Sequence, residues 1–196
     1  AGIDFFVPRV RERLEEEELL ELVGDIDGAI TGDDRFTRRV IRAAPRLRVI
    51  SKWGTGIDSI DREACIEHGV RVCNTPGAFT IPVADSTFAY MLAFARRLSE
   101  QAEQMRCGTW EKLPGVTLAE STVGIVGVGA IGREVARRAA AFGARVVGCD
   151  VRDVPPMLIA QTGIEMVSLE RLLRESDFVT LHTDLNPTSR KLMNRE

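Results

Sequence analysis

The sequence predicts an α/β fold built on parallel sheets, and two observations carry that prediction. Short apolar segments alternate with longer amphipathic segments along most of the chain. This alternation is typical of β–α–β units, whose right-handed crossovers wind parallel strands into a doubly wound sheet. It is interrupted once, by a long helical stretch and the turn Leu113-Pro114-Gly115. We therefore expect two domains, residues 1–81 and residues 82–196.

In the first stretch, strands are expected at residues 27–31, 47–51 and 70–73, with helices at 14–23, 36–44 and 61–68. Pro45 should end the second helix, because proline cannot continue it, and Gly69 should cap the third in a left-handed conformation.

A long helix is expected from Pro82 to Arg106, since proline suits a first helical turn. Its inner face should be formed by Ala89, Leu92, Ala93 and Leu98, which recur at helical spacing. The helix carries further large apolar residues, namely Phe88, Tyr90, Met91 and Phe94. One domain needs only one buried face, so this surplus favours a homodimer.

In the last stretch, strands are expected at 122–126, 145–149 and 178–181, with helices at 131–142 and 169–175. A G-x-G-x-x-G sequence, Gly127 to Gly132, joins the first of these strands to the first of these helices. In this context Gly127 permits a tight turn, Gly129 lets the backbone approach a diphosphate, and Gly132 lets helix and strand pack closely. The positive end of the helix dipole points at the phosphates. The stretch is therefore expected to be a Rossmann-type dinucleotide-binding domain.

Asp150 ends the next strand and can accept hydrogen bonds from both hydroxyls of an adenosine ribose. A carboxylate there repels a 2′-phosphate, so NAD is the expected cofactor, although Arg152 lies nearby with a positive charge. Enzymes that use S-adenosylmethionine have a related glycine loop and acidic residue, and a methyltransferase remains an alternative at this point.

Composition limits the other function classes. The chain is 44% hydrophobic and 28% charged with a net charge of −3, which is the balance of a soluble globular protein and a poor one for binding nucleic acid or anionic membranes. No apolar run approaches membrane length and no signal peptide begins the sequence. The four cysteines and two histidines lack ligand spacing, so we expect no metal and buried free thiols in the cytoplasm.

A second glycine loop, Lys52 to Asp58, follows the strand at 47–51. A Gly-x-Gly sequence at the carboxyl end of a parallel strand exposes backbone N–H groups that bind a carboxylate or phosphate, and Lys52 adds a cation. An ordinary tight turn explains the same residues equally well.

The ordered series KWGTGIDSID, NTPG, ADSTFAYMLAFAR, TVGIVGVGAIGREVARR and SLERLLRESDFVTLHTDLNPTSR resembles the D-isomer-specific 2-hydroxyacid dehydrogenases. The likeness is nearest to D-3-phosphoglycerate dehydrogenase-like members. It implies a flavodoxin-like substrate domain beside a Rossmann domain, both incomplete here, and hydride transfer between NAD(H) and C2 of a 2-hydroxy or 2-oxo acid.

The resemblance also assigns residues. It implies that Lys52, Gly54, Thr55 and Gly56 bind the substrate anion. The cofactor residues it implies, together with the glycine motif, are Thr75, Gly127, Gly129, Ala130, Ile131, Gly132, Asp150 and Thr183.

No residue of this chain matches the family's catalytic Arg, Glu or His. His182 matches a strand-end segment at the cofactor and is interpreted as a structural residue rather than a base. We therefore expect the 196-residue chain to be inactive as a dehydrogenase. A regulatory protein that senses NAD(H) with the same fold, without turnover, is the alternative.

Overall fold

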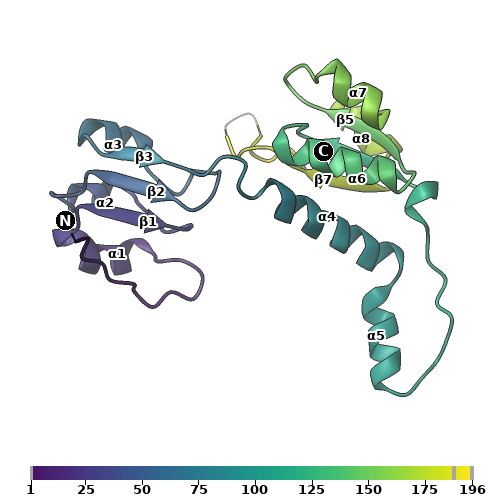
Figure 1. Ribbon diagram of the computed structural model, residues 1–196, viewed down its shortest axis with the longest axis horizontal. Coiled ribbons are helices and arrows are strands. Elements are labelled where there is room, and N and C mark those ends of the chain that lie inside the picture. Colours follow the sequence, from purple (N-terminus) through teal and green to yellow (C-terminus); the bar gives the residue numbers. More distant parts are fainter. Residues whose placement is uncertain (1, 187–188, 195–196) are drawn as a thin grey trace. The chain divides into compact units, whose positions relative to one another are not determined.

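The computed structural model describes residues 2–186 and 189–194, so Pro187 and Thr188 of the last quoted motif lie outside the described residues. The chain divides into two compact units between Ala78 and Phe79, slightly before the boundary expected at residue 81. Each unit is an α/β structure with a parallel sheet, and most of the elements are labelled in Figure 1. The predicted fold class is confirmed.

The first unit contains every strand and helix expected from its sequence, with ends shifted by a few residues. Its elements are α1 (Glu16–Leu22), β1 (Gly28–Thr31), α2 (Arg38–Arg42), β2 (Val49–Lys52), α3 (Arg62–Glu67) and β3 (Arg71–Cys73), plus a 3-10 turn at Val23–Asp25. The strands run parallel in the order β1-β2-β3. The side chains of Thr37 and Asp61 accept hydrogen bonds from the first turns of α2 and α3, which fixes where these helices begin.

One face of this sheet forms the core of the first unit. Ile50 of β2 packs with Val40 and Ile41 of α2 and with Cys65 of α3, and all four are almost completely buried. Residues alternate between the two faces of a strand, so Ile30 of β1 lies on the opposite face, where it is 84% exposed. The buried residues of α1, α2 and α3 therefore form one cluster with the sheet.

The second unit contains α4 (Thr80–Ala95), α5 (Leu98–Arg106), β4 (Thr122–Val126), α6 (Ala130–Ala141), β5 (Arg145–Cys149), α7 (Pro156–Thr162), β6 (Glu165–Met166), α8 (Leu169–Glu175) and β7 (Phe178–Leu181). A 3-10 turn at Leu118–Glu120 precedes β4. Its strands are parallel in the order β6-β5-β4-β7. This order, third-second-first-fourth along the unit, is the one with which a Rossmann sheet begins.

Helices cover both faces of the second sheet. Val123 and Ile125 of β4 share a buried cluster with residues of α4, α6 and α7. Val126 faces the other side, where it packs with Leu172 of α8. A Cβ placed on Gly124 would lie 2.7 Å from a methyl carbon of Leu172, so β4 has glycine where α8 packs closest. The sheet is therefore doubly wound, as predicted.

The expectation of one helix from Pro82 to Arg106 is wrong. Arg97 adopts a left-handed conformation with φ of 54°, which ends α4 and starts α5 in a new direction. The expected inner face is only partly right, because Leu92 packs against the core but Ala89 and Leu98 are exposed. The buried residues of α4 are Ala84, Phe88, Met91 and Ala95, which recur at three or four residues along one continuous helix.

Two smaller elements of the second unit were not expected from the sequence. Helix α7 begins directly after a Pro155-Pro156 pair, and β6 has only two residues, too few to show a periodic pattern. The expectation of buried thiols holds for Cys65 but is wrong for Cys73 and Cys107, which are exposed. Among the described residues, no helix is long and apolar enough to cross a membrane.

Candidate functional site

The glycine loop of the second unit lies where β4 ends and α6 begins. Gly127 has φ of +89°, a conformation that favours glycine, and a Cβ there would lie 2.6 Å from the carbonyl oxygen of His182. A Cβ on Gly132 would overlap the carbonyl oxygen of Gly127. These two glycines are therefore required for the packing of β4, α6 and the segment after β7.

Gly129 differs from the other two glycines of the motif. Its φ of −74° is open to any residue, and a Cβ there would meet one atom within 4 Å, a terminal nitrogen of Arg152 at 3.6 Å. Gly129 is also the N-cap of α6, and no side chain of the described residues caps that end of the helix. The first turn, which contains Ala130 and Ile131, thus presents backbone N–H groups to open space, as an anion-binding helix end requires.

Asp150 is held beside this loop by two hydrogen bonds. Its Oδ2 accepts from the N–H of Val128 at 2.6 Å, and its Oδ1 accepts from the N–H of Arg152 at 2.9 Å. Its side chain is only 6% exposed. A carboxylate has about four acceptor positions, so two remain for further donors such as the hydroxyls of a ribose. The loop and the carboxylate that follows β5 therefore form one site.

Strand β7 brings a third segment to the same place. It pairs with β4, and the chain leaves it at His182 and Thr183. The methyl carbon of Thr183 lies 3.0 Å from the Cβ position of Gly127. The boundary between β4 and β7 is the point where the strand order reverses, and open α/β sheets bind ligands at the carboxyl ends of strands at such a point.

His182 is partly buried, and burial lowers the pKa of its imidazole below the ordinary value because the charged form loses solvation. Its Nε2 lies 2.9 Å from the hydroxyl oxygen of Thr180. Burial therefore favours the neutral imidazole, and its Nε2 is engaged by a side chain of β7.

In the first unit, the loop after β2 is joined to the segment after β3. The N–H of Gly54 donates to the hydroxyl of Thr75 at 3.0 Å, and the N–H of Thr75 donates to the carbonyl of Gly54 at 3.0 Å. The side chain of Asn74 donates to the carbonyl of Thr55 at 2.8 Å. Within the described residues, the N–H groups of Thr55 and Gly56 make no hydrogen bond. These two amides, rather than that of Gly54, are free to bind an anion.

The side chain of Lys52 is buried against this loop and does not extend into solvent. The residue is 3% exposed, and its ammonium group donates to the carboxylate of Asp33 and to the carbonyl of Gly32. Its Cε is 3.0 Å from the Cβ position of Gly54. Asp33 is well exposed at 79%. The cation thus ties the ends of β1 and β2 together, and its charge is already paired.

Comparison with known proteins places the chain. The family model of the D-isomer specific 2-hydroxyacid dehydrogenase NAD binding domain matches residues 88–196, more than half of the chain. The chain belongs to this family. The second unit, which contains the glycine loop, is thus the NAD-binding domain, and the cofactor is NAD.

Several relatives of these dehydrogenases cover nearly the whole chain. A D-3-phosphoglycerate dehydrogenase of Methanocaldococcus jannaschii is 38% identical over 93% of this chain and 36% of its own length. A hydroxypyruvate reductase of Thermotoga maritima is 37% identical over 94% of this chain and 60% of its own length. The chain therefore spans between about a third and three fifths of the length of these relatives.

Two solved structures with the same fold cover most of this chain. A Thermus thermophilus protein is 40% identical, with a TM-score of 0.82 over 98% of this chain and 60% of that one. A D-lactate dehydrogenase of Aquifex aeolicus, complexed with NAD and lactic acid, is 26% identical with a TM-score of 0.81 over 89% of this chain and 54% of that one.

The residues of the second unit fit NAD. Gly129 leaves open space where a diphosphate approaches, the first turn of α6 has uncapped N–H groups, and Asp150 keeps acceptor positions for ribose hydroxyls.

Two features of the charged side chains were not predicted from the sequence. The position of Arg152 over Gly129 depends on a side-chain conformation, and the pairing of Lys52 with Asp33 depends on which strand ends are adjacent.

The contrast between Gly129 and Gly132 predicts separable effects. Gly129→Ala should leave the free energy of unfolding unchanged but weaken NADH binding about tenfold, the loss of one charged hydrogen bond. Gly132→Ala should lower the free energy of unfolding by about 1–3 kcal/mol, because its methyl group overlaps a backbone oxygen. Urea denaturation and NADH fluorescence titration of both variants measure this. Equal destabilisation by the two substitutions would contradict the assignment.

Proposed function

We propose that the chain is the NAD(H)-binding and carboxylate-binding part of an enzyme that transfers hydride between NAD(H) and C2 of a D-2-hydroxy or 2-oxo acid. The observation that carries the proposal is the open glycine loop at the N-terminus of α6 with Asp150 fixed beside it. The free, exposed thiols of Cys73 and Cys107 fit the reducing cytoplasm, where such an enzyme would act.

The chain's own residues would divide the work of binding. The first turn of α6 would hold the cofactor diphosphate and Asp150 the adenosine ribose. The amides of Thr55 and Gly56 would hold the substrate carboxylate. When bound, NAD supplies or accepts the hydride. We assign no acid–base catalyst to this chain, because Nε2 of His182 is engaged by the hydroxyl of Thr180, and we propose that the 196-residue chain binds NADH without turning over 2-oxo acids.

The unmodified chain should bind NADH more tightly than NADPH, because a 2′-phosphate would meet the carboxylate of Asp150. Asp150→Ala should weaken NADH binding about tenfold and reduce the preference, since a charge-assisted hydrogen bond contributes about 1.5–3 kcal/mol. Fluorescence titration with both cofactors tests this. Equal affinity of the unmodified chain for NADH and NADPH would refute it.

We propose that Lys52 binds the phosphate of a phosphorylated substrate such as 3-phosphoglycerate. The ammonium group would release the carboxylate of Asp33 and pair with the phosphate instead. Lys52→Ala in the intact enzyme should then raise KM for a phosphorylated substrate more than about tenfold, and more than for a small unphosphorylated 2-oxo acid. Asp33→Asn is the matched control, because it keeps Lys52 and removes its competitor. It should lower KM for the phosphorylated substrate. Equal effects of Lys52→Ala on both substrates would mean that the lysine only supports the loop.

We also propose a homodimer formed through the outer face of α4. Phe88 and Met91, two residues of the expected surplus, belong to the unit's own core, but Tyr90 and Phe94 are 75% and 85% exposed. Phe94→Asp should therefore raise the dimer dissociation constant at least about thirtyfold, as the loss of a central aromatic contact does. Phe5→Asp, at a phenylalanine that is 79% exposed in the first unit, is the control. Analytical ultracentrifugation decides, and a monomer at high concentration of the unmodified chain would exclude the dimer.

A further inference from the structure

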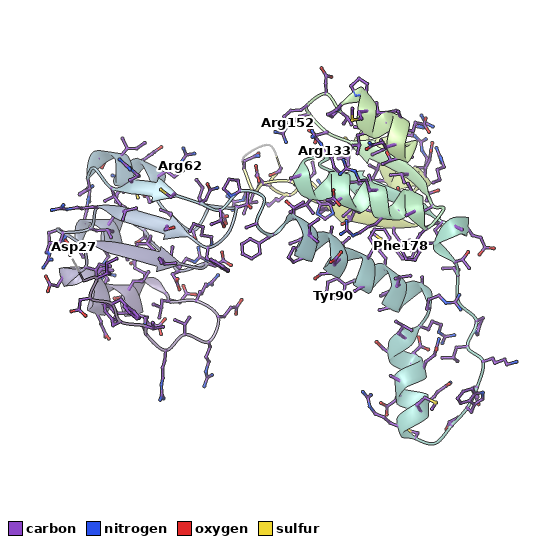
Figure 2. The ribbon with its side chains drawn as sticks, viewed as in Figure 1. Asp27, Arg62, Tyr90, Arg133, Arg152 and Phe178 are labelled. Carbon is purple, nitrogen blue, oxygen red and sulfur yellow. The ribbon has the colours of Figure 1, made fainter. Side chains whose placement is uncertain are left out.

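The side chain of Arg152 lies over the glycine loop, although among the described residues it makes no close ion pair there. Its terminal nitrogen is 3.6 Å from the Cβ position of Gly129, the N-cap of α6. The side chain is 77% exposed, and its Nε is 3.8 Å from Oδ1 of Asp150. Figure 2 shows Arg152 and Arg133 at the same end of the second unit, where α6 begins.

This position is unfavourable for a cation in the chain alone. The N-terminus of a helix carries the positive end of its dipole, which disfavours a nearby positive charge by about 0.3–1 kcal/mol. The carboxylate of Asp150 compensates for only part of this, because it lies 3.8 Å from Nε of Arg152, beyond hydrogen-bond distance. Arg138 shows the favourable arrangement, since it lies in the last turn of α6 and pairs with Glu134 at 2.8 Å and Asp85 at 2.7 Å.

The glycine loop itself has no cation to offer a diphosphate. Residues 127–132 are glycine, valine, alanine and isoleucine. Arg133, the next residue, donates from its Nε to the carbonyl of Val128 at 3.2 Å, so it supports the loop. Among the described side chains, Arg152 is the cation that lies within 4 Å of the Cβ position of Gly129.

We propose that Arg152 is the cation that binds the cofactor diphosphate, across the loop from the N-terminus of α6. The proposal rests on the proposed function, because it needs NAD(H) in this site. An anion placed between the guanidinium and the helix end interacts favourably with both, which removes the unfavourable contact of the free chain. The hydrogen bond from the N–H of Arg152 to Asp150 fixes the backbone, while the exposed side chain can adjust to the ligand.

The geometry also separates this role from recognition of a 2′-phosphate. Asp150 uses both carboxylate oxygens to hold the backbone of Val128 and Arg152, and its remaining acceptor positions serve the ribose. The guanidinium is placed over Gly129, the residue of the motif that a diphosphate approaches, and that is the group we assign to it.

Ligands that differ by one group test the proposal in the 196-residue chain. NADH and ADP contain a diphosphate, whereas adenosine has the same ribose without one. Arg152→Ala should weaken NADH and ADP about tenfold or more, which is the loss of one charge-assisted contact, and change adenosine affinity less than twofold. Arg152→Lys should restore part of the ADP affinity, because it keeps the charge without the bidentate geometry. Ligand-observed NMR and calorimetry measure all three ligands.

The matched control is Arg174→Ala. Arg174 is an exposed arginine of the same unit, 69% exposed, and it lies 3.6 Å from the carboxylate of Glu170. It should change no affinity, and urea denaturation should show that both alanine variants remain folded.

Three results would overturn the proposal. The first is that Arg152→Ala leaves NADH and ADP affinity within twofold, the second that it weakens adenosine binding as much as ADP binding, and the third that it weakens NADPH binding far more than NADH binding. The second would show that Arg152 acts through Asp150, and the third that it binds a 2′-phosphate. An unmodified chain that does not bind NADH would instead refute the proposed function, and this inference with it.

Discussion

The close approach of α6 to the end of β4 is the constraint on which the second unit depends. Gly132 lies against the carbonyl of Gly127, and Gly127 in turn lies against the carbonyl of His182 after β7. The end of β4, the first turn of α6 and the distant segment after β7 therefore meet at backbone-to-backbone distance, which only glycine allows. This contact directs the first turn of α6 towards the place where the strand order reverses, and thereby creates the cofactor site.

The same contact explains why the rest of the unit has its particular packing. With α6 fixed on one face of β4, α8 occupies the other face over Gly124, and α4 covers α6 through a stack of Phe88 on Phe142, with ring centres 5.5 Å apart. Asp150 completes the loop by holding the N–H of Val128. Packing and cofactor binding thus use the same residues, so substitutions that fill the packed glycines should disturb both.

The sequence predicted most of the fold because its signals are local. The strands at Thr122–Val126 and Arg145–Cys149 and the helix α6 come from short apolar runs and a glycine motif that each lie within a few residues. Prediction from the sequence failed where the structure depends on one backbone angle or on a weak pattern. The left-handed Arg97 carries no sequence signal, since arginine is ordinary inside a helix, and β6 is too short to show alternation.

The two cations near the glycine loops show a second limit. Lys52 and Arg152 look alike in the sequence, because each stands beside a loop that follows a parallel strand. In the structure Lys52 is buried and paired with Asp33, whereas Arg152 is exposed and directed at a helix N-terminus. Burial and partners are long-range properties, so residue type and spacing cannot supply them.

This difference in pairing also separates what each cation can do. A buried lysine with a carboxylate partner must lose that partner before it can bind a substrate anion, so any gain is reduced by the cost of breaking the pair. An exposed arginine beside a helix dipole of the same sign gains from an anion without losing anything comparable. Charge arrangement therefore leaves the guanidinium of Arg152 available to an anion in the free chain, whereas the ammonium of Lys52 becomes available only when Asp33 is displaced.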